Sequence, residues 1–127
     1  MIEGFLRKAA PEPMPGEIFA LISPHAGYGF SGQAAAFGYK LVKDKAYKTV
    51  VVIGTSHHYG FNGVAVYPQG AFRTPLGDVG VDAEFAGKLL NQDEDITFKA
   101  QAFAKEHSVE VQLPFLLARQ PNLKIVP

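Results

Sequence analysis

T-V-V-V-I-G-T-S-H-H-Y-G, at residues 49–60, decides the fold, because a short apolar run leads directly into a turn that carries two adjacent histidines. Upstream, F-A-L-I at residues 19–22 leads in the same way into S-P-H-A-G-Y at residues 23–28. Apolar runs without polar alternation are typical of strands buried on both faces, as in a parallel sheet. Ligands collect at the carboxyl ends of such strands. We therefore predict an α/β fold, with a largely parallel sheet, that holds His25 and His57 at one edge.

The first half of the chain predicts a β-α-β unit behind a short leader. Residues 1–16 have the pattern of a helix end followed by a proline-rich linker, in which proline removes amide donors and holds the chain extended. Ser31 is the expected N-cap of the helix in the unit, because its hydroxyl can accept from an unpaired amide of the first turn. The unit is expected to have strands at residues 17–22 and 49–53, a helix at residues 32–42 and a solvated turn at residues 43–48.

The second half predicts further strands and two helices. Asp82 is expected to cap a helix at residues 83–90, and residues 106–119 have an amphipathic pattern with Pro114 predicted to kink it. Residues 68–80 are rich in glycine and proline, which predicts a long loop or irregular hairpin with Phe72 and Leu76 against the body. Further strands are expected at residues 63–67, 96–98 and 122–127.

Composition excludes several classes of protein. The chain has 127 residues, with 12 Lys and Arg against 12 Asp and Glu, so no net field attracts nucleic acid or an anionic membrane surface. Cysteine is absent, which excludes disulfides and thiol catalysis within these residues. No apolar run approaches the roughly 20 residues that span a bilayer. We expect a cytoplasmic protein with neither nucleic-acid nor membrane partners.

Histidines at two neighbouring strand ends are typical of a metal site. Neutral imidazole is the commonest side-chain ligand for iron, copper and zinc, and two imidazoles with a third ligand would leave open positions. Successive extended side chains point apart, so we expect His57 rather than His58 to face His25. The alternative is structural: His25 would cap a turn, and the histidine pair at residues 57–58 would only make a loop polar.

Two other motifs suggest a dinucleotide site and a hydrolase triad, and both are weaker indications than the metal site. G-Y-G-F-S-G at residues 27–32 matches a dinucleotide-binding pattern, but the second strand ends in G-T-S-H without the carboxylate that such a site needs. Glu106, His107 and Ser108 cannot form a hydrolase triad, because three adjacent residues do not fold back on one another. His107 is expected at a helix start, where its ring can reach the site. Arg73 and Asp78 are candidates for substrate contacts, and a surface salt bridge explains them equally well.

Together these motifs resemble the Memo family. P-H-A-G-Y at residues 24–28, G-T-S-H-H at residues 54–58, R-T-P-L-G-D at residues 73–78 and E-H-S-V-E-V-Q-L-P at residues 106–114 occur in the order and spacing of that family. The resemblance implies a fold similar to class III extradiol dioxygenases, with His25 and His57 as metal ligands. It also implies a further ligand outside this sequence. Residues 1–127 are therefore expected to form a partial domain, with a leader at 1–16 and a β-α-β core at 17–127 that carries the 68–80 loop.

The resemblance implies a divalent metal, iron(II) first, with copper or zinc as alternatives. His58 and His107 would then be proton-transfer groups acting on a small-molecule ligand. The other function we consider is a non-catalytic module that binds a small ligand or peptide in the same pocket.

Overall fold

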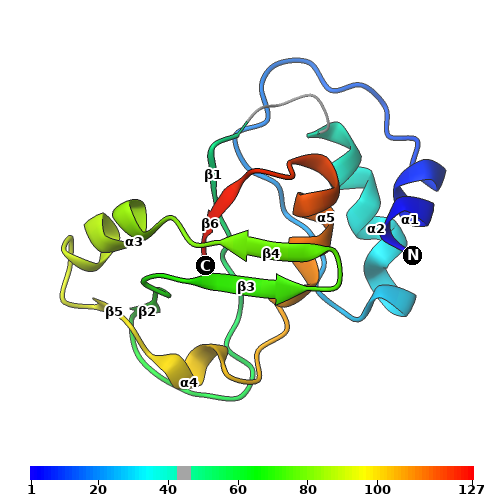
Figure 1. Ribbon diagram of the computed structural model, residues 1–127. Coiled ribbons are helices and arrows are strands. Elements are labelled where there is room, and N and C mark those ends of the chain that lie inside the picture. The colour runs from blue at the N-terminus through cyan, green and yellow to red at the C-terminus, as the bar shows by residue number, and fades with distance from the viewer. Residues whose placement is uncertain (43–46) are drawn as a thin grey trace.

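The computed structural model describes residues 1–42 and 47–127, so most of the turn expected at residues 43–48 lies outside the described residues. The described chain mixes helices with short, mostly parallel strands, in agreement with an α/β fold (Figure 1). The helix expected near the N-terminus and the helix capped by Asp82 are both confirmed. The elements in chain order are α1 (Ile2–Lys8), α2 (Tyr28–Leu41), β1 (Thr49–Val51), β2 (Val64–Ala65), β3 (Ala71–Thr74), β4 (Gly77–Gly80), α3 (Ala83–Leu90), β5 (Ile96–Thr97), α4 (Ala100–Phe103), η1 (Glu110–Gln112), α5 (Leu113–Arg119) and β6 (Lys124–Val126).

Strand β6 is central to the pairing. It runs parallel to β1, with Val50 opposite Ile125. On its other side Val81 forms a parallel bridge with Ile125, and the Tyr67 amide donates to the Pro127 carbonyl over 3.2 Å. Strands β2 and β5 form a second parallel pair, and β3 and β4 form an antiparallel hairpin. The chain after β1 and the chain after β2 therefore both leave from the region where β6 ends.

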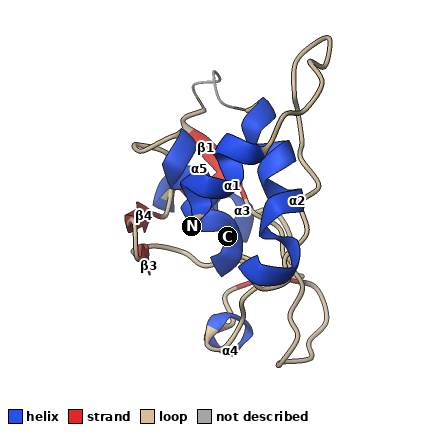
Figure 2. Ribbon diagram, turned by 90° about the vertical axis from the view of Figure 1, so that its right-hand side faces the viewer, coloured by secondary structure: helices blue, strands red, loops and turns tan. Residues whose placement is uncertain are grey.

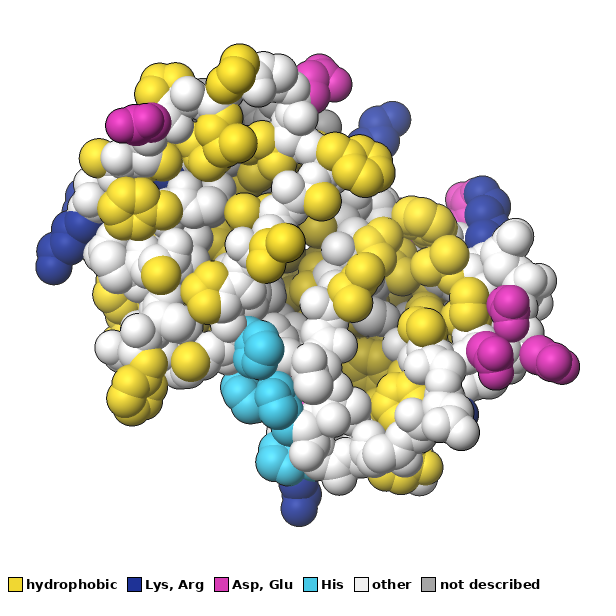
Figure 3. Space-filling view, turned by 180° about the vertical axis from the view of Figure 1, so that it is seen from behind, with side chains coloured by type: hydrophobic (Ala, Val, Ile, Leu, Met, Phe, Trp, Pro, Cys, Tyr) yellow, Lys and Arg dark blue, Asp and Glu magenta, His cyan; other side chains and the backbone are white. Residues whose placement is uncertain are grey.

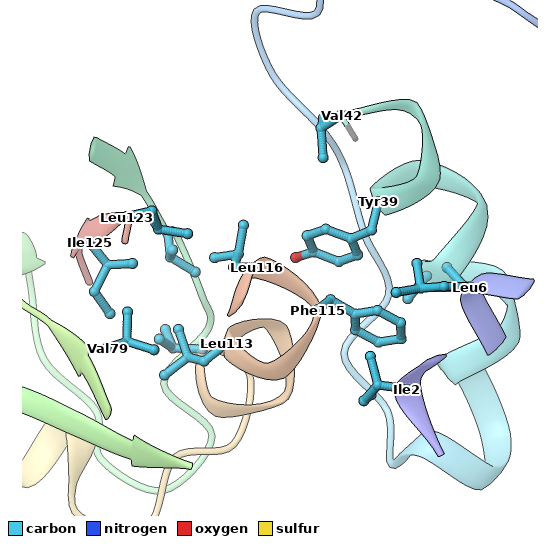
Figure 4. Close-up of a cluster of buried hydrophobic side chains, with 14 of the residues drawn as sticks. Ile2, Leu6, Tyr39, Val42, Val79, Leu113, Phe115, Leu116, Leu123 and Ile125 are labelled. Atoms are coloured by element: carbon cyan, nitrogen blue, oxygen red, sulfur yellow. The ribbon is translucent and has the colours of Figure 1, made fainter. Parts of the chain in front are cut away.

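The core is organised around α5, which is buried from Leu113 to Leu116. Phe115 stacks on Tyr39 of α2, with ring centroids 4.9 Å apart and planes 1° from parallel. Figure 4 shows Phe115 facing Ile2 and Leu6 of α1, while Leu113 points toward Val79 of the hairpin. Helix α5 thus packs against both the helices and the hairpin strand β4.

Helices α1, α2 and α5 pack beside one another (Figure 2). The approach of α1 to α2 is close enough that a Cβ at Gly32 would lie 2.6 Å from the ring of Phe5. Side chains of α2 also donate to the last carbonyls of α1, Gln33 to Phe5 and Lys40 to Leu6. No helix among the described residues combines the length and apolar composition needed to cross a membrane.

The expectation of strands buried on both faces is wrong. Residues 17–22 belong to no strand among the described residues, and Phe19 and Ile22 are fully exposed. Along β1 and its continuation, Val52 is buried, whereas Val51 and Ile53 are exposed. An apolar run supplies strand propensity, but burial of both faces needs an element on each side, and among the described residues the core covers one side of this run.

Other features differ from the sequence prediction because tertiary structure outweighs the local pattern. Helix α2 begins at Tyr28 with Gly27 as its N-cap, and Ser31 lies inside the helix, where its hydroxyl donates to the Ala26 carbonyl. Pro114 does not kink a long helix; it lies in the first turn of α5, where a missing amide costs nothing. Residues 68–80 do contain a hairpin, and Leu76 at its tip is exposed rather than packed.

Candidate metal centre

The rings of His25, His57 and His107 meet on one face of the molecule, although their segments are far apart in the sequence. His57 follows β1, His25 precedes α2, and His107 lies between α4 and η1. The ring centroids are 5.2 Å apart for His25 and His57, 6.0 Å for His25 and His107, and 4.8 Å for His57 and His107. Figure 3 shows the histidine side chains gathered beside a hollow lined with hydrophobic atoms. The two histidine loops therefore lie together, as their positions after apolar runs predicted.

The carboxylate of Glu106 anchors this cluster. Its Oε2 accepts from the backbone amide of His57 over 2.6 Å, and its Oε1 pairs with Nδ1 of the same residue over 2.8 Å. Oε1 also accepts from the backbone amides of His107 and Ser108, each over 2.8 Å. The Glu106 side chain is only 6% exposed. One buried carboxylate therefore ties the loop after β1 to the segment before η1.

These hydrogen bonds decide the charge of Glu106. Burial alone would raise the pKa of this carboxyl, but hydrogen bonds from His57 and Ser108 stabilise the ionised form and hold the pKa well below its ordinary value of 4.5. Glu106 is therefore a carboxylate at neutral pH.

A second tie holds the same two segments in contact. The hydroxyl of Ser108, a buried residue, donates to the Thr55 carbonyl over 2.9 Å. At Gly54 the backbone passes so close that an added Cβ would overlap the Ser108 hydroxyl and lie 3.0 Å from Val109. Glycine at residue 54 is what permits this approach.

Gln112 fixes the His25 loop. Its Nε2 donates to the Pro24 carbonyl over 3.3 Å and to the Ser108 carbonyl over 3.4 Å, while its Oε1 accepts from the Tyr39 hydroxyl over 2.6 Å. Gln112 is itself buried. A single amide therefore connects α2, the loop before His25 and η1, so all segments that carry the clustered histidines are linked by hydrogen bonds.

The donor set suits a divalent metal. One nitrogen or oxygen from each of His57, Glu106 and His107 lies within 4.8 Å of the others. Imidazole and carboxylate donors are the ligands preferred by iron and zinc, and Nδ1 of His57 is already paired, which leaves its Nε2 as the nitrogen for a ligand role. The clustered imidazoles of His25, His57 and His107 therefore fit such an ion.

The predicted site residues are placed differently from one another. The ring of His57 faces His25, and the ring centroid of His58 is 6.4 Å from that of His57; both residues are exposed. His107 reaches the cluster. The ligand roles predicted for His25 and His57, and the proton-transfer roles predicted for His58 and His107, remain predictions.

The sequence alone suggests Glu106 only as a member of a local hydrolase triad, and its place in the histidine cluster is not predicted. In the structure its carboxylate bonds the ring of His57, while Nδ1 of the adjacent His107 is 3.6 Å away. The available signal was a carboxylate next to a histidine just before a helix. Arg73 and Asp78 pair with each other across the exposed hairpin, Nε to Oδ1 over 3.4 Å, which favours the surface salt bridge over a substrate contact.

An apolar groove of about 380 Å³ adjoins the cluster. Its walls are the chain at residues 51–56 and residues 63–66, with the rings of Phe61 and Phe103 also lining it. Glu106 and Ser108 line the same groove, so it reaches the anchoring carboxylate.

The family model described as Memo-like protein matches residues 1–127. The combination of a mixed α/β fold with clustered histidines at strand and helix termini is thus found in a chain that belongs to the Memo-like protein family. The family resemblance of the four motifs is confirmed.

Several curated relatives are named as MEMO1 family proteins. That of Methanopyrus kandleri is 45% identical over 111 residues, covering 84% of this chain and 36% of the relative. That of Pyrobaculum aerophilum is 42% identical over 113 residues, covering 88% and 40%. That of Methanococcus vannielii is 38% identical over 135 residues, covering 97% and 47%. The chain thus spans less than half the length of these relatives.

Proposed function

We propose that this chain contributes a divalent-metal site similar to that of class III extradiol dioxygenases, with His25 and His57 as imidazole ligands. The observation that supports it most is the convergence of the rings of His25, His57 and His107, with centroids 4.8 to 6.0 Å apart. Hydrogen bonds hold the segments that carry these rings, so the ligands would be positioned before any ion binds.

Iron(II) is the metal that we propose first. Two imidazoles and one acidic ligand form the open face typical of non-haem iron(II), with copper and zinc as alternatives. The family resemblance assigns the acidic or thiolate ligand to a part of the fold other than residues 1–127. When bound, the metal would supply Lewis acidity and redox chemistry to a small substrate.

The chain's own residues would orient that substrate and move protons. His107, stacked at 4.8 Å on His57, would exchange a proton with a substrate held beside the cluster. His58, which is exposed, would exchange protons with solvent. The apolar groove would hold the hydrophobic part of the substrate and exclude water from it.

Ferrous-iron affinity, measured anaerobically for the chain and its variants, tests this proposal. His25→Ala and His57→Ala should each weaken binding by 10-fold or more, which corresponds to about 1.4 kcal/mol. His58→Ala is the matched control and should leave affinity unchanged. Absence of binding by the parent chain, or binding indifferent to both substitutions, would contradict the ligand assignment.

A second candidate function is ligand binding without chemistry. The apolar lining of the groove favours it, because such a lining binds small apolar ligands with or without a metal. Oxygen consumption with ferrous iron and a panel of catechols separates the two. Consumption that is lost in His57→Ala supports the dioxygenase-like function, and ligand binding without consumption supports the second.

A further inference from the structure

Within the part of the chain that the structure describes, the ring of His57 is hydrogen-bonded at one nitrogen, Nδ1. Glu106 Oε1 lies 2.8 Å from Nδ1, and the same oxygen accepts from the backbone amides of His107 and Ser108. An oxygen that already accepts from two backbone amides is placed to accept a further hydrogen bond rather than to donate one. Nδ1 of His57 must therefore be the donor.

We infer that Glu106 is a positioning residue, which keeps the proton of His57 on Nδ1 and thereby presents Nε2 to a divalent cation. The tautomer of a ligating histidine is set by the hydrogen bond of its other nitrogen, most often to a carboxylate or a carbonyl. Glu106 does both jobs that this requires: Oε1 fixes the ring, and Oε2 fixes the His57 backbone over 2.6 Å.

The same contacts argue against Glu106 as a ligand itself. Its proximity to His57 and His107 makes it a candidate ligand. However, four N–H groups already point at a carboxylate with about four acceptor sites, and the side chain is 6% exposed. A cation bound through Glu106 would have to displace the bonds that hold the loop.

The tautomer of His57 can be measured without any metal. Ring ¹⁵N shifts of the metal-free chain are recorded at about pH 8, well above the ordinary histidine pKa of about 6.5. We expect His57 to carry its proton on Nδ1 with Nε2 unprotonated. A His57 ring protonated on Nε2 in the parent chain would overturn the inference, and this measurement needs no variant to fold.

Glu106→Gln tests the consequence, with Glu110→Gln as its matched control. Both remove one negative charge, but Glu110 is an exposed residue of η1, four positions along the chain. Glu106→Gln should shift His57 toward the Nε2-protonated form and weaken Zn²⁺ binding by about 10- to 100-fold. Glu110→Gln should keep the tautomer and change Zn²⁺ affinity by less than about 2-fold. Equal weakening by both variants would overturn the positioning role, because charge alone would then explain the loss.

The predicted effect of Glu106 on Zn²⁺ affinity rests on the metal site proposed above. The metal site and the Glu106–His57 pairing can nevertheless fail separately. A parent chain that binds no Zn²⁺ yet shows His57 protonated on Nδ1 contradicts the metal site and supports the Glu106–His57 pairing. A chain that binds Zn²⁺ through His57 protonated on Nε2 supports the metal site and overturns the role of Glu106.

Discussion

Gly54 lies where the chain leaves β1 and passes closest to Ser108. In Gly54→Ala the new Cβ would overlap the Ser108 hydroxyl, so either that hydroxyl leaves the Thr55 carbonyl or the segments separate. Overpacking of this kind costs about 1–3 kcal/mol. We expect Gly54→Ala to lower the free energy of unfolding in urea by that amount.

The control for this variant lies in the same loop. A Cβ at Gly60 would meet nothing within 4 Å, so Gly60→Ala should change the free energy of unfolding by less than about 0.5 kcal/mol. Equal effects of the two alanines would show that the loop, rather than the approach to Ser108, determines the loss.

Glu106 also makes the stability of the folded chain depend on pH in the acidic range. Its pKa is lower in the folded state than the ordinary 4.5, because His57 and Ser108 donate to the carboxylate and outweigh the opposing effect of burial. The stability gained from ionised Glu106 is therefore fully present above pH 4.5 and is lost as the pH falls from there through the folded-state pKa.

The difference in free energy of unfolding between the parent chain and Glu106→Gln measures this contribution. It should be constant at neutral pH and should shrink once the pH falls below 4.5, in urea titrations of both chains. A difference that instead grew on acidification would show that Glu106 has a raised pKa in the folded chain.

Among individual residues, the sequence identifies some members of the candidate site and not others. His25 and His57 could be found because each follows an apolar run, and a run and its turn are local features. Glu106 could not be assigned, because its partner His57 lies in a separate segment and the pairing depends on where α5 docks. Local motifs identify the histidines of the cluster more readily than the carboxylate that pairs with one of them.

Among the elements, α2 and η1 are joined by the buried bond between Tyr39 and Gln112. Tyr39→Phe would leave Gln112 Oε1 without that donor while keeping the ring stacked on Phe115. An unsatisfied buried acceptor costs about 1–3 kcal/mol. We expect the urea midpoint to fall accordingly, whereas Tyr59→Phe, at an exposed position, should leave it unchanged.

Because Gln112 also donates to the Pro24 carbonyl, the Tyr39 substitution has a second expected effect. The ring of His25 should become more mobile, which broadens or shifts its NMR signals. A stability loss without any change at His25 would show that Gln112 holds Pro24 independently of Tyr39.

The helices and strands also show why some of their boundaries cannot be predicted from the sequence. The amphipathic spacing over residues 106–119 predicts one helix. In the structure, however, the carboxylate of Glu106 accepts hydrogen bonds from the amides of His107 and Ser108, and regular α-helix begins only at Leu113. Likewise, residues 17–22 have strand propensity, yet β1 is paired with β6. A strand exists only with its ladder, and propensity does not specify the partner.

Over the whole molecule, the α/β class could be predicted because helix and strand patterns alternate along the chain. The exposure of Phe19, Ile22 and Ile53 could not be predicted, because burial of a side chain depends on which faces of its segment other elements cover. The site itself is a property of the whole fold, since His25, His57 and His107 come together only when α2, β1 and η1 are all in place.

Metal binding should therefore stabilise the folded chain specifically. An unfolded chain keeps these histidines apart, so a cation that needs them together binds the native state preferentially. At a free Zn²⁺ concentration of about 100 times the dissociation constant, the free energy of unfolding should rise by about 2.7 kcal/mol. Urea unfolding with and without Zn²⁺ measures this increment. It should disappear in His57→Ala and persist in His58→Ala, and an increment that survived the loss of His57 would mean that Zn²⁺ binds elsewhere on the chain.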